Sequence, residues 1–157
     1  MMTSNLSFGT FPESTFVRAN LYESTLVGGN FEKANFTGAN MTRVDFMGST
    51  LIEANFQNAN LMEANFTSSN MTNANFDGAN LIGANFEKAH FIGANLTSVD
   101  FMGSTLIDAN FQNANLMEAN FVSSNITNTN FDGANLNGAT WTDGKKCGLE
   151  SIGKCNK

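Results

Sequence analysis

A large apolar residue recurs at every fifth position of this chain, and this spacing constrains the fold more than any other feature. Stepping by five from Leu6 to Trp141 gives 28 such positions, which we call centres, without an insertion or deletion: 14 Phe, 10 Leu, two Met, one Ile and one Trp. A strand repeats every two residues and a helix every 3.6, so neither element places residues five apart on one face. The chain must therefore bend once in each five-residue unit.

The remaining positions of the unit indicate how it bends. The residue two before the centre is small in all but three units, with 16 Ala, 7 Ser and 2 Gly, and the residue just before the centre is Asn in 19 units. These three positions alternate as in a very short strand, with the small and large residues inward and Asn outward. Gly, which tolerates the positive φ of tight turns, fills the second position after the centre nine times. Repeated corners of one hand wind the chain into a coil that buries the centres along its axis.

This unit resembles that of the pentapeptide repeat family, whose consensus is Ala, Asp or Asn, Leu or Phe, and two variable residues. Runs such as ANFQNANLMEANF at 54–66 carry the resemblance, which extends over about 4–143. It implies an all-β fold, a right-handed quadrilateral parallel β-helix, which is a solenoid with four units in each coil. Twenty-eight units would make about seven coils and, at ~4.8 Å per coil, a rod about 34 Å long.

Two regions are expected from where the repeat stops. Residues 1–143 are predicted to form the pentapeptide-repeat β-helix, and residues 144–157 a short C-terminal cap, since the end of a solenoid needs a cover. A short helical turn is expected within the cap, over 149–152.

A second, longer repeat lies over the first. Residues 31–85 and 86–140 align without gaps at an offset of 55, which is eleven units. We number the four faces of the expected coil from the centres Leu6, Phe11, Phe16 and Leu21. Because eleven is not a multiple of four, duplicated residues should lie a quarter turn apart, so that a surface pattern needed on one face would be scrambled. Many surface residues are therefore expected to derive from the duplication rather than from selection for one binding face.

The sequence contains no recognisable catalytic or metal-binding pattern. His90 is the single histidine and occupies a slot otherwise filled mostly by Asn, so we interpret it as a substitute in an outward column. There is no Gly-rich phosphate loop and no Ser and His pairing, and the acidic residues are scattered singly. We predict that the protein is not an enzyme and uses no cofactor and no metal.

The two cysteines lie in the tail. Cys147 and Cys155 are eight residues apart and lack the further Cys or His of a zinc site. They would form a disulfide in an oxidising compartment and remain free thiols in a cytosol. No run of 18 apolar residues is present, and the start MMTSNLSFGTF lacks the features of a signal peptide. A cytoplasmic location without membrane contact is expected.

The charge is divided unevenly. Residues up to 143 hold 13 acidic and 4 basic side chains, net −9, whereas 144–157 hold four Lys against one Glu, net +3. An acidic rod is not expected to bind nucleic acid directly. Some bacterial members of the family, of the quinolone-resistance type, imitate duplex DNA and bind DNA gyrase. A duplex as long as this rod carries about 20 negative charges, whereas the repeat region carries nine net negative charges. The DNA-mimicking modulator of gyrase or topoisomerase is therefore our alternative function rather than the first.

One face carries an apolar column. On face four, the slot after each centre holds Tyr22, Thr42, Met62, Ile82, Met102, Val122 and Thr142. The candidate partner surface comprises five of them, Tyr22, Met62, Ile82, Met102 and Val122. Such a strip marks a protein partner or self-association, unless the slot lies partly within the corner and takes apolar residues on every face. Our first interpretation is a non-enzymatic structural or protein-interaction scaffold whose partner the sequence does not identify.

Overall fold

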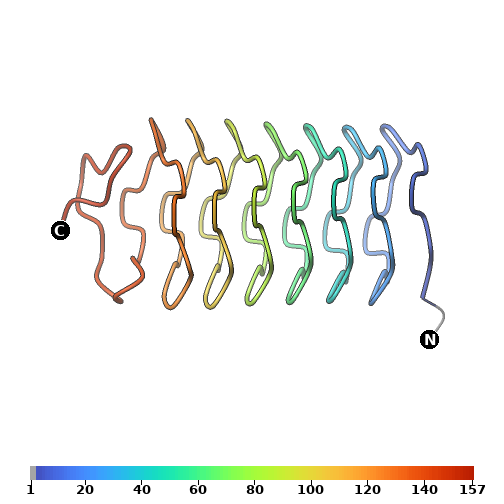
Figure 1. Cartoon of the computed structure of the whole chain (residues 1–157), viewed down its shortest axis with the longest axis horizontal. Coiled ribbons are helices and arrows are strands. Elements are labelled where there is room, and N and C mark those ends of the chain that lie inside the picture. Colours follow the sequence, from blue (N-terminus) through green and yellow to red (C-terminus); the bar gives the residue numbers. More distant parts are fainter. Residues whose placement is uncertain (1–2) are drawn as a thin grey trace.

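The computed structural model describes residues 3–157; Met1 and Met2, at the start of the predicted repeat region, lie outside them. Similar coils stack along one axis, and the two termini lie at opposite ends of the rod (Figure 1). The described residues form neither helices nor extended strands. Their regular elements are single bridged residues, and the parallel bridges join residues 20 apart, from Asn5 with Thr25 to Asn120 with Thr140. Since a bridge recurs every five residues, the coil has four sides with one unit on each.

The backbone N–H groups of one unit show why this sequence adopts the coil. The N–H of Phe56 donates to the carbonyl of Asn75 at 2.7 Å, and that of Asn58 to the next coil at 3.0 Å. The N–H of Asn55 donates to the previous coil at 2.9 Å, and that of Ala59 closes the corner on Phe56 at 2.9 Å. The fifth N–H, of Gln57, donates at 3.0 Å to the side-chain oxygen of Asn55. Every N–H of the unit is thus satisfied, the last of them by Asn.

The centres form stacked columns along the axis. The rings of Phe56 and Phe76, which are one coil apart, stack with their centroids 4.6 Å apart and their planes 11° from parallel. Rings on neighbouring faces meet edge to face, as Phe56 and Phe66 do at 6.0 Å and 89°. Both arrangements are favourable for aromatic rings. All centres from Leu21 to Phe121 are buried.

The two copies of the longer repeat keep the same local structure on different faces. Met47 and Met102 are 44% and 41% exposed although they occupy different columns. The hydroxyls of Ser49 and Ser104 each donate to the carbonyl 23 residues earlier, at 2.7 and 2.8 Å. The duplicated units therefore keep the same local environment on the different faces that they occupy.

Each corner needs a left-handed residue. From Phe8 to Gly138, the second residue after every centre has a φ between 53° and 69°, and the N–H that follows it closes the corner on the carbonyl of the centre. This is the pattern of a type II turn. None of these residues is Val, Ile or Thr, because a branched Cβ is costly in the left-handed region.

At Gly103 the cost of the left-handed conformation can be measured without a steric clash. Its φ is +68° and no atom lies within 4 Å of the Cβ that a larger residue would add. Gly103→Val is expected to lower the free energy of unfolding by about 2 kcal/mol, and Gly103→Asn by less than about 1 kcal/mol, since Asn tolerates the left-handed region. Urea unfolding followed by circular dichroism measures both values. Equal losses for Val and Asn would contradict the explanation.

After Trp141 the chain turns back across the last coil, as the red segment of Figure 1 shows. Antiparallel bridges join Thr140 with Lys146 and Asn135 with Ile152. The expected helical turn over 149–152 was wrong: Glu150 has a φ of 62° and Ile152 is bridged. An extended tail pairs with the free backbone groups of the last coil, which a helical turn cannot do.

Candidate functional site

The face-four strip, Tyr22, Met62, Ile82, Met102 and Val122, lies along one side of the rod. Parallel bridges between the Asn and Asp residues two positions before place the last four of these residues on successive coils. Met102 is 41% exposed, whereas the other four are half-buried. The slot after the centre is also half-buried on other faces, as at Ile52 and Ile107, so part of the apolar character of the strip belongs to the corner. Met62, Ile82, Met102 and Val122 are contiguous, whereas Thr42 separates them from Tyr22.

The corner beside the strip carries few long side chains. Gly83, Gly103 and Ser123 follow Ile82, Met102 and Val122 in the chain. At Gly83 the nearest side-chain atom is Cγ of Glu63, 3.7 Å from an added Cβ, and at Gly103 there is none within 4 Å. The corner residues after these apolar side chains are therefore short, although Ile82 and Val122 themselves remain half-buried.

A charged group borders the strip at its N-terminal end. Arg43 donates from Nε to Glu63 at 2.7 Å and from Nη1 to Glu23 at 3.4 Å and the Tyr22 hydroxyl at 3.5 Å. The hydrogen bond to Glu63, and then the negative charges around it, raise the pKa of Arg43 above its ordinary value. All three charged side chains are about half exposed, so the group contributes little to stability. The formal net charge of the group is −1.

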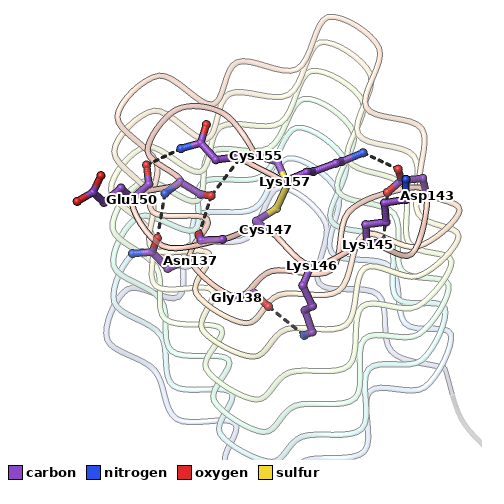
Figure 2. Close-up of a disulfide and its surroundings, with 12 residues drawn as sticks. Asn137, Gly138, Asp143, Lys145, Lys146, Cys147, Glu150, Cys155 and Lys157 are labelled. Atoms are coloured by element: carbon purple, nitrogen blue, oxygen red, sulfur yellow. Dashed lines mark hydrogen bonds and ion pairs between the residues drawn. A yellow bond between two sulfur atoms is a disulfide. The ribbon is translucent and has the colours of Figure 1, made fainter.

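The tail is held by a disulfide. Cys147 and Cys155 are bonded, with their Cα atoms 5.0 Å apart, and Figure 2 shows the bridge lying across the end of the coil. Cys147 is buried, as is Ser151, whose N–H donates to the Asn137 side chain at 3.0 Å and whose hydroxyl donates to the carbonyl of Gly148 at 2.8 Å. Hydrogen bonds of its backbone and side chains anchor the tail to the last coil, and the disulfide closes a loop of eight residues within the tail.

Lysines of the tail neutralise the end of the rod. The Lys157 ammonium donates to the Asp143 carboxylate, to which the Lys145 N–H also donates at 3.2 Å (Figure 2). The contact with Lys157, followed by that with Lys145, holds the pKa of Asp143 below its usual value. Lys146 donates to the carbonyl of Gly138 at 2.9 Å. These are exposed contacts that orient the tail.

The described part of the chain contains no candidate catalytic or metal-binding site. Among residues 3–157 there is neither a pocket nor a cluster of three His, Cys, Asp or Glu side chains able to hold a metal. His90 is exposed and stands in a column between Asn70 and Asn110. Nor do these residues form any helix of the length and apolarity that a membrane crossing requires.

The sequence interpretation missed two features of the surface. The Arg43 group was not expected, although Glu23, Arg43 and Glu63 are 20 residues apart and thus one coil apart in one column, so the period of the coil was a sufficient signal. The bond from the Asn side chain to the N–H two residues on was also missed. Asn side chains also bond to Asn side chains of the neighbouring coils, and a continuous ladder of such bonds runs through Asn55, Asn75, Asn95, Asn115 and Asn135 on face three.

Four-sided coils, parallel bridges 20 residues apart and candidate sites confined to the surface define a β-helical repeat protein. The sequence pattern of the pentapeptide repeats matches the chain in eight copies, over residues 4–38, 14–51, 30–67, 69–106 and 105–140. The chain belongs to the pentapeptide repeat family. No curated protein sequence matches it significantly.

Solved structures of this family share the fold. A pentapeptide repeat protein from the Arabidopsis thaliana thylakoid lumen is 35% identical over 61% of this chain and 67% of its own, with a TM-score of 0.59. A trypsin-treated variant of QnrB1, a plasmid-mediated fluoroquinolone resistance protein, is 19% identical over 86% of this chain and 73% of its own, with a TM-score of 0.51. At that identity the second likeness concerns the fold alone. Both neighbours imply that the coil is a right-handed quadrilateral β-helix.

Proposed function

We propose that this protein is a non-enzymatic protein-interaction scaffold: a β-helix of about seven coils, capped by residues 144–157, that binds a protein partner through the face-four strip. The supporting observation is the run of Met62, Ile82, Met102 and Val122 on successive coils, beside corners that Gly83 and Gly103 leave bare. Contiguous apolar side chains on an accessible surface are typical of contact sites. The coil supplies a rigid backbone, so that binding orders few groups.

The duplication supplies a matched control for testing the strip. Met102 lies on face four and Met47, its duplicate, lies on face one with nearly the same exposure. Met102→Glu is expected to weaken partner capture or self-association at least tenfold, because a charge would be placed in an apolar contact, whereas Met47→Glu should leave it unchanged. Light scattering after size exclusion and quantitative capture on immobilised protein measure the two effects. Equal behaviour of both variants would remove the strip from the proposal.

The net charge of −9 over the repeat supports one competing function, the modulation of gyrase as a DNA mimic. About 20 charges lie on a duplex of the same length, and here fewer than half that number are spread over four faces. We expect neither inhibition of gyrase supercoiling nor protection from a quinolone at any protein concentration. Inhibition by the wild type and not by a variant with its outward carboxylates neutralised would favour the mimic instead.

A further inference from the structure

The tail pairs with the backbone N–H groups of the last coil on two sides only. On faces three and four the tail accepts the N–H groups of Leu136, Gly138 and Trp141, at 2.8, 3.1 and 2.8 Å. On faces one and two, no acceptor within residues 3–157 pairs with the N–H groups of the last coil, those of Ile126, Asn128, Phe131 and Gly133. Unpaired donors of this kind form an edge on which another chain can pair.

The first coil presents the matching acceptors. Throughout the rod, a centre and the residue two after it donate to the carbonyls 19 residues later, in the next coil. In the first coil the corresponding carbonyls of faces one and two accept no backbone N–H from the described residues; they belong to Asn5, Ser7, Thr10 and Pro12. Asn5 and Asn125 stand at the two ends of one column of bridges. If the first coil of a second copy continued the rod beyond the last coil, the same hydrogen-bonding pattern would pair each of the four N–H groups with one of the four carbonyls.

The side chains match as well as the backbone. Phe11, half-buried at the open end of face two, would stand over Phe131 in the column where Phe111 already stacks on Phe131 at 5.4 Å. Leu6 and Phe16 are half-buried too, unlike the centres inside the rod. A second copy of this chain would bury all three.

We propose that the last coil is a docking edge for the first coil of a second copy, and that the tail, fastened by the Cys147–Cys155 disulfide, keeps this edge closed. The tail takes the backbone bonds of Leu136 and Trp141 on faces three and four, and its Gly153 lies against Gly133 of face two, so it occupies positions that an incoming coil would need. A four-sided coil cannot sit on faces one and two alone, because its other two sides would occupy the position of the tail. Docking therefore requires the tail to leave.

Reduction supplies the opening step. A dithiol reductant transfers two electrons to the disulfide: the S–S bond breaks, Cys147 and Cys155 become thiols, and the dithiol becomes a cyclic disulfide. Without the cross-link, the open fraction of the tail should rise on the order of a hundredfold. The two docking surfaces lie at opposite ends of the rod (Figure 1), so the contact is heterologous and builds open-ended rods rather than closed dimers. It does not involve the face-four strip and stands independently of the proposed function.

Sedimentation velocity of the full chain tests the proposal. The oxidised protein should remain a monomer, whereas the protein in dithiothreitol and the Cys147→Ser/Cys155→Ser variant without reductant should form linear species whose mean mass grows with concentration. Circular dichroism checks that the coil stays folded. Monomers under all three conditions, a species that stops at the dimer, or equal association of the oxidised protein would overturn the proposal.

A variant pair in the cysteine-free background tests the docking edge itself. The N–H of Thr10 has no acceptor among the described residues, and in the stack it would donate to the carbonyl of Thr129. Thr10→Pro removes this donor and places a ring against the incoming edge, whereas Thr10→Ala keeps the donor. We expect the proline variant to need at least a tenfold higher concentration to associate. Equal association of the two variants contradicts end-to-end docking, whatever the result for the strip.

Discussion

Replacing Phe66 with alanine is expected to lower the free energy of unfolding by about 3 to 5 kcal/mol. Phe66 is fully buried and lies between Phe46 and Phe86, with ring centroids 5.2 and 5.1 Å away, and edge to face with Phe56 and Phe76. The truncation leaves a cavity in the middle of the rod. It cannot collapse, because backbone hydrogen bonds on all sides fix the spacing of the coils. Urea unfolding followed by circular dichroism measures the loss.

Two further variants test how the loss depends on the size of the side chain and on its burial. Phe66→Leu should cost only about 1 kcal/mol, since leucine is the centre of 10 of the 28 units and suits the same environment. Phe11→Ala should cost less than Phe66→Ala, because Phe11 is half-buried at the end of the rod. A loss for Phe66→Leu as large as that for Phe66→Ala would contradict this expectation, because it would show that leucine cannot replace the stacked ring.

Replacing Cys147 and Cys155 with serine is expected to favour opening of the tail by about 2.5 kcal/mol, the value for a cross-link that closes a loop of this size. The bridge spans eight residues, and without it the free tail gains chain entropy. The amides of Leu136 and Gly138 report the opening, because both donate to tail carbonyls. Their hydrogen exchange should accelerate on the order of a hundredfold.

Two controls accompany the serine variant. Dithiothreitol should reproduce the acceleration in the wild type and change nothing in the serine variant. The amide of Phe66, which donates to the neighbouring coil at 2.7 Å, should keep its protection in all samples. Unchanged exchange at Leu136 and Gly138 would mean that hydrogen bonds alone hold the tail.

The fold could be predicted from the sequence because one environment is repeated many times. Phe56, Phe76 and the other centres share a period that permits only a coil with corners, and the resemblance to a known family supplied its four sides. The tail lacks this redundancy. A local pattern over 149–152 indicated a helical turn, whereas the backbone groups left open by the last coil determined an extended path, and these groups are invisible in a linear sequence.

The surface was less predictable than the core. The column of Met62, Ile82 and Met102 follows from the 20-residue period, but its half-burial depends on how the corner folds over each side chain. The pairing of Cys147 with Cys155 was an open alternative, since sequence spacing does not decide the redox state. Whether the strip binds a partner stays a prediction, because the residues of a contact surface carry no pattern that core packing enforces.

The duplicated halves are offset by a quarter turn, so each surface residue and its duplicate lie on neighbouring faces of the four. Because Ser49 and Ser104 keep the same bond on different faces, the core does not record which side a unit occupies. Removing or inserting one five-residue unit would rotate every later side chain by one face while the columns of centres close again behind it. One such event therefore moves every side chain after it to the neighbouring face while the stacking of the centres is kept.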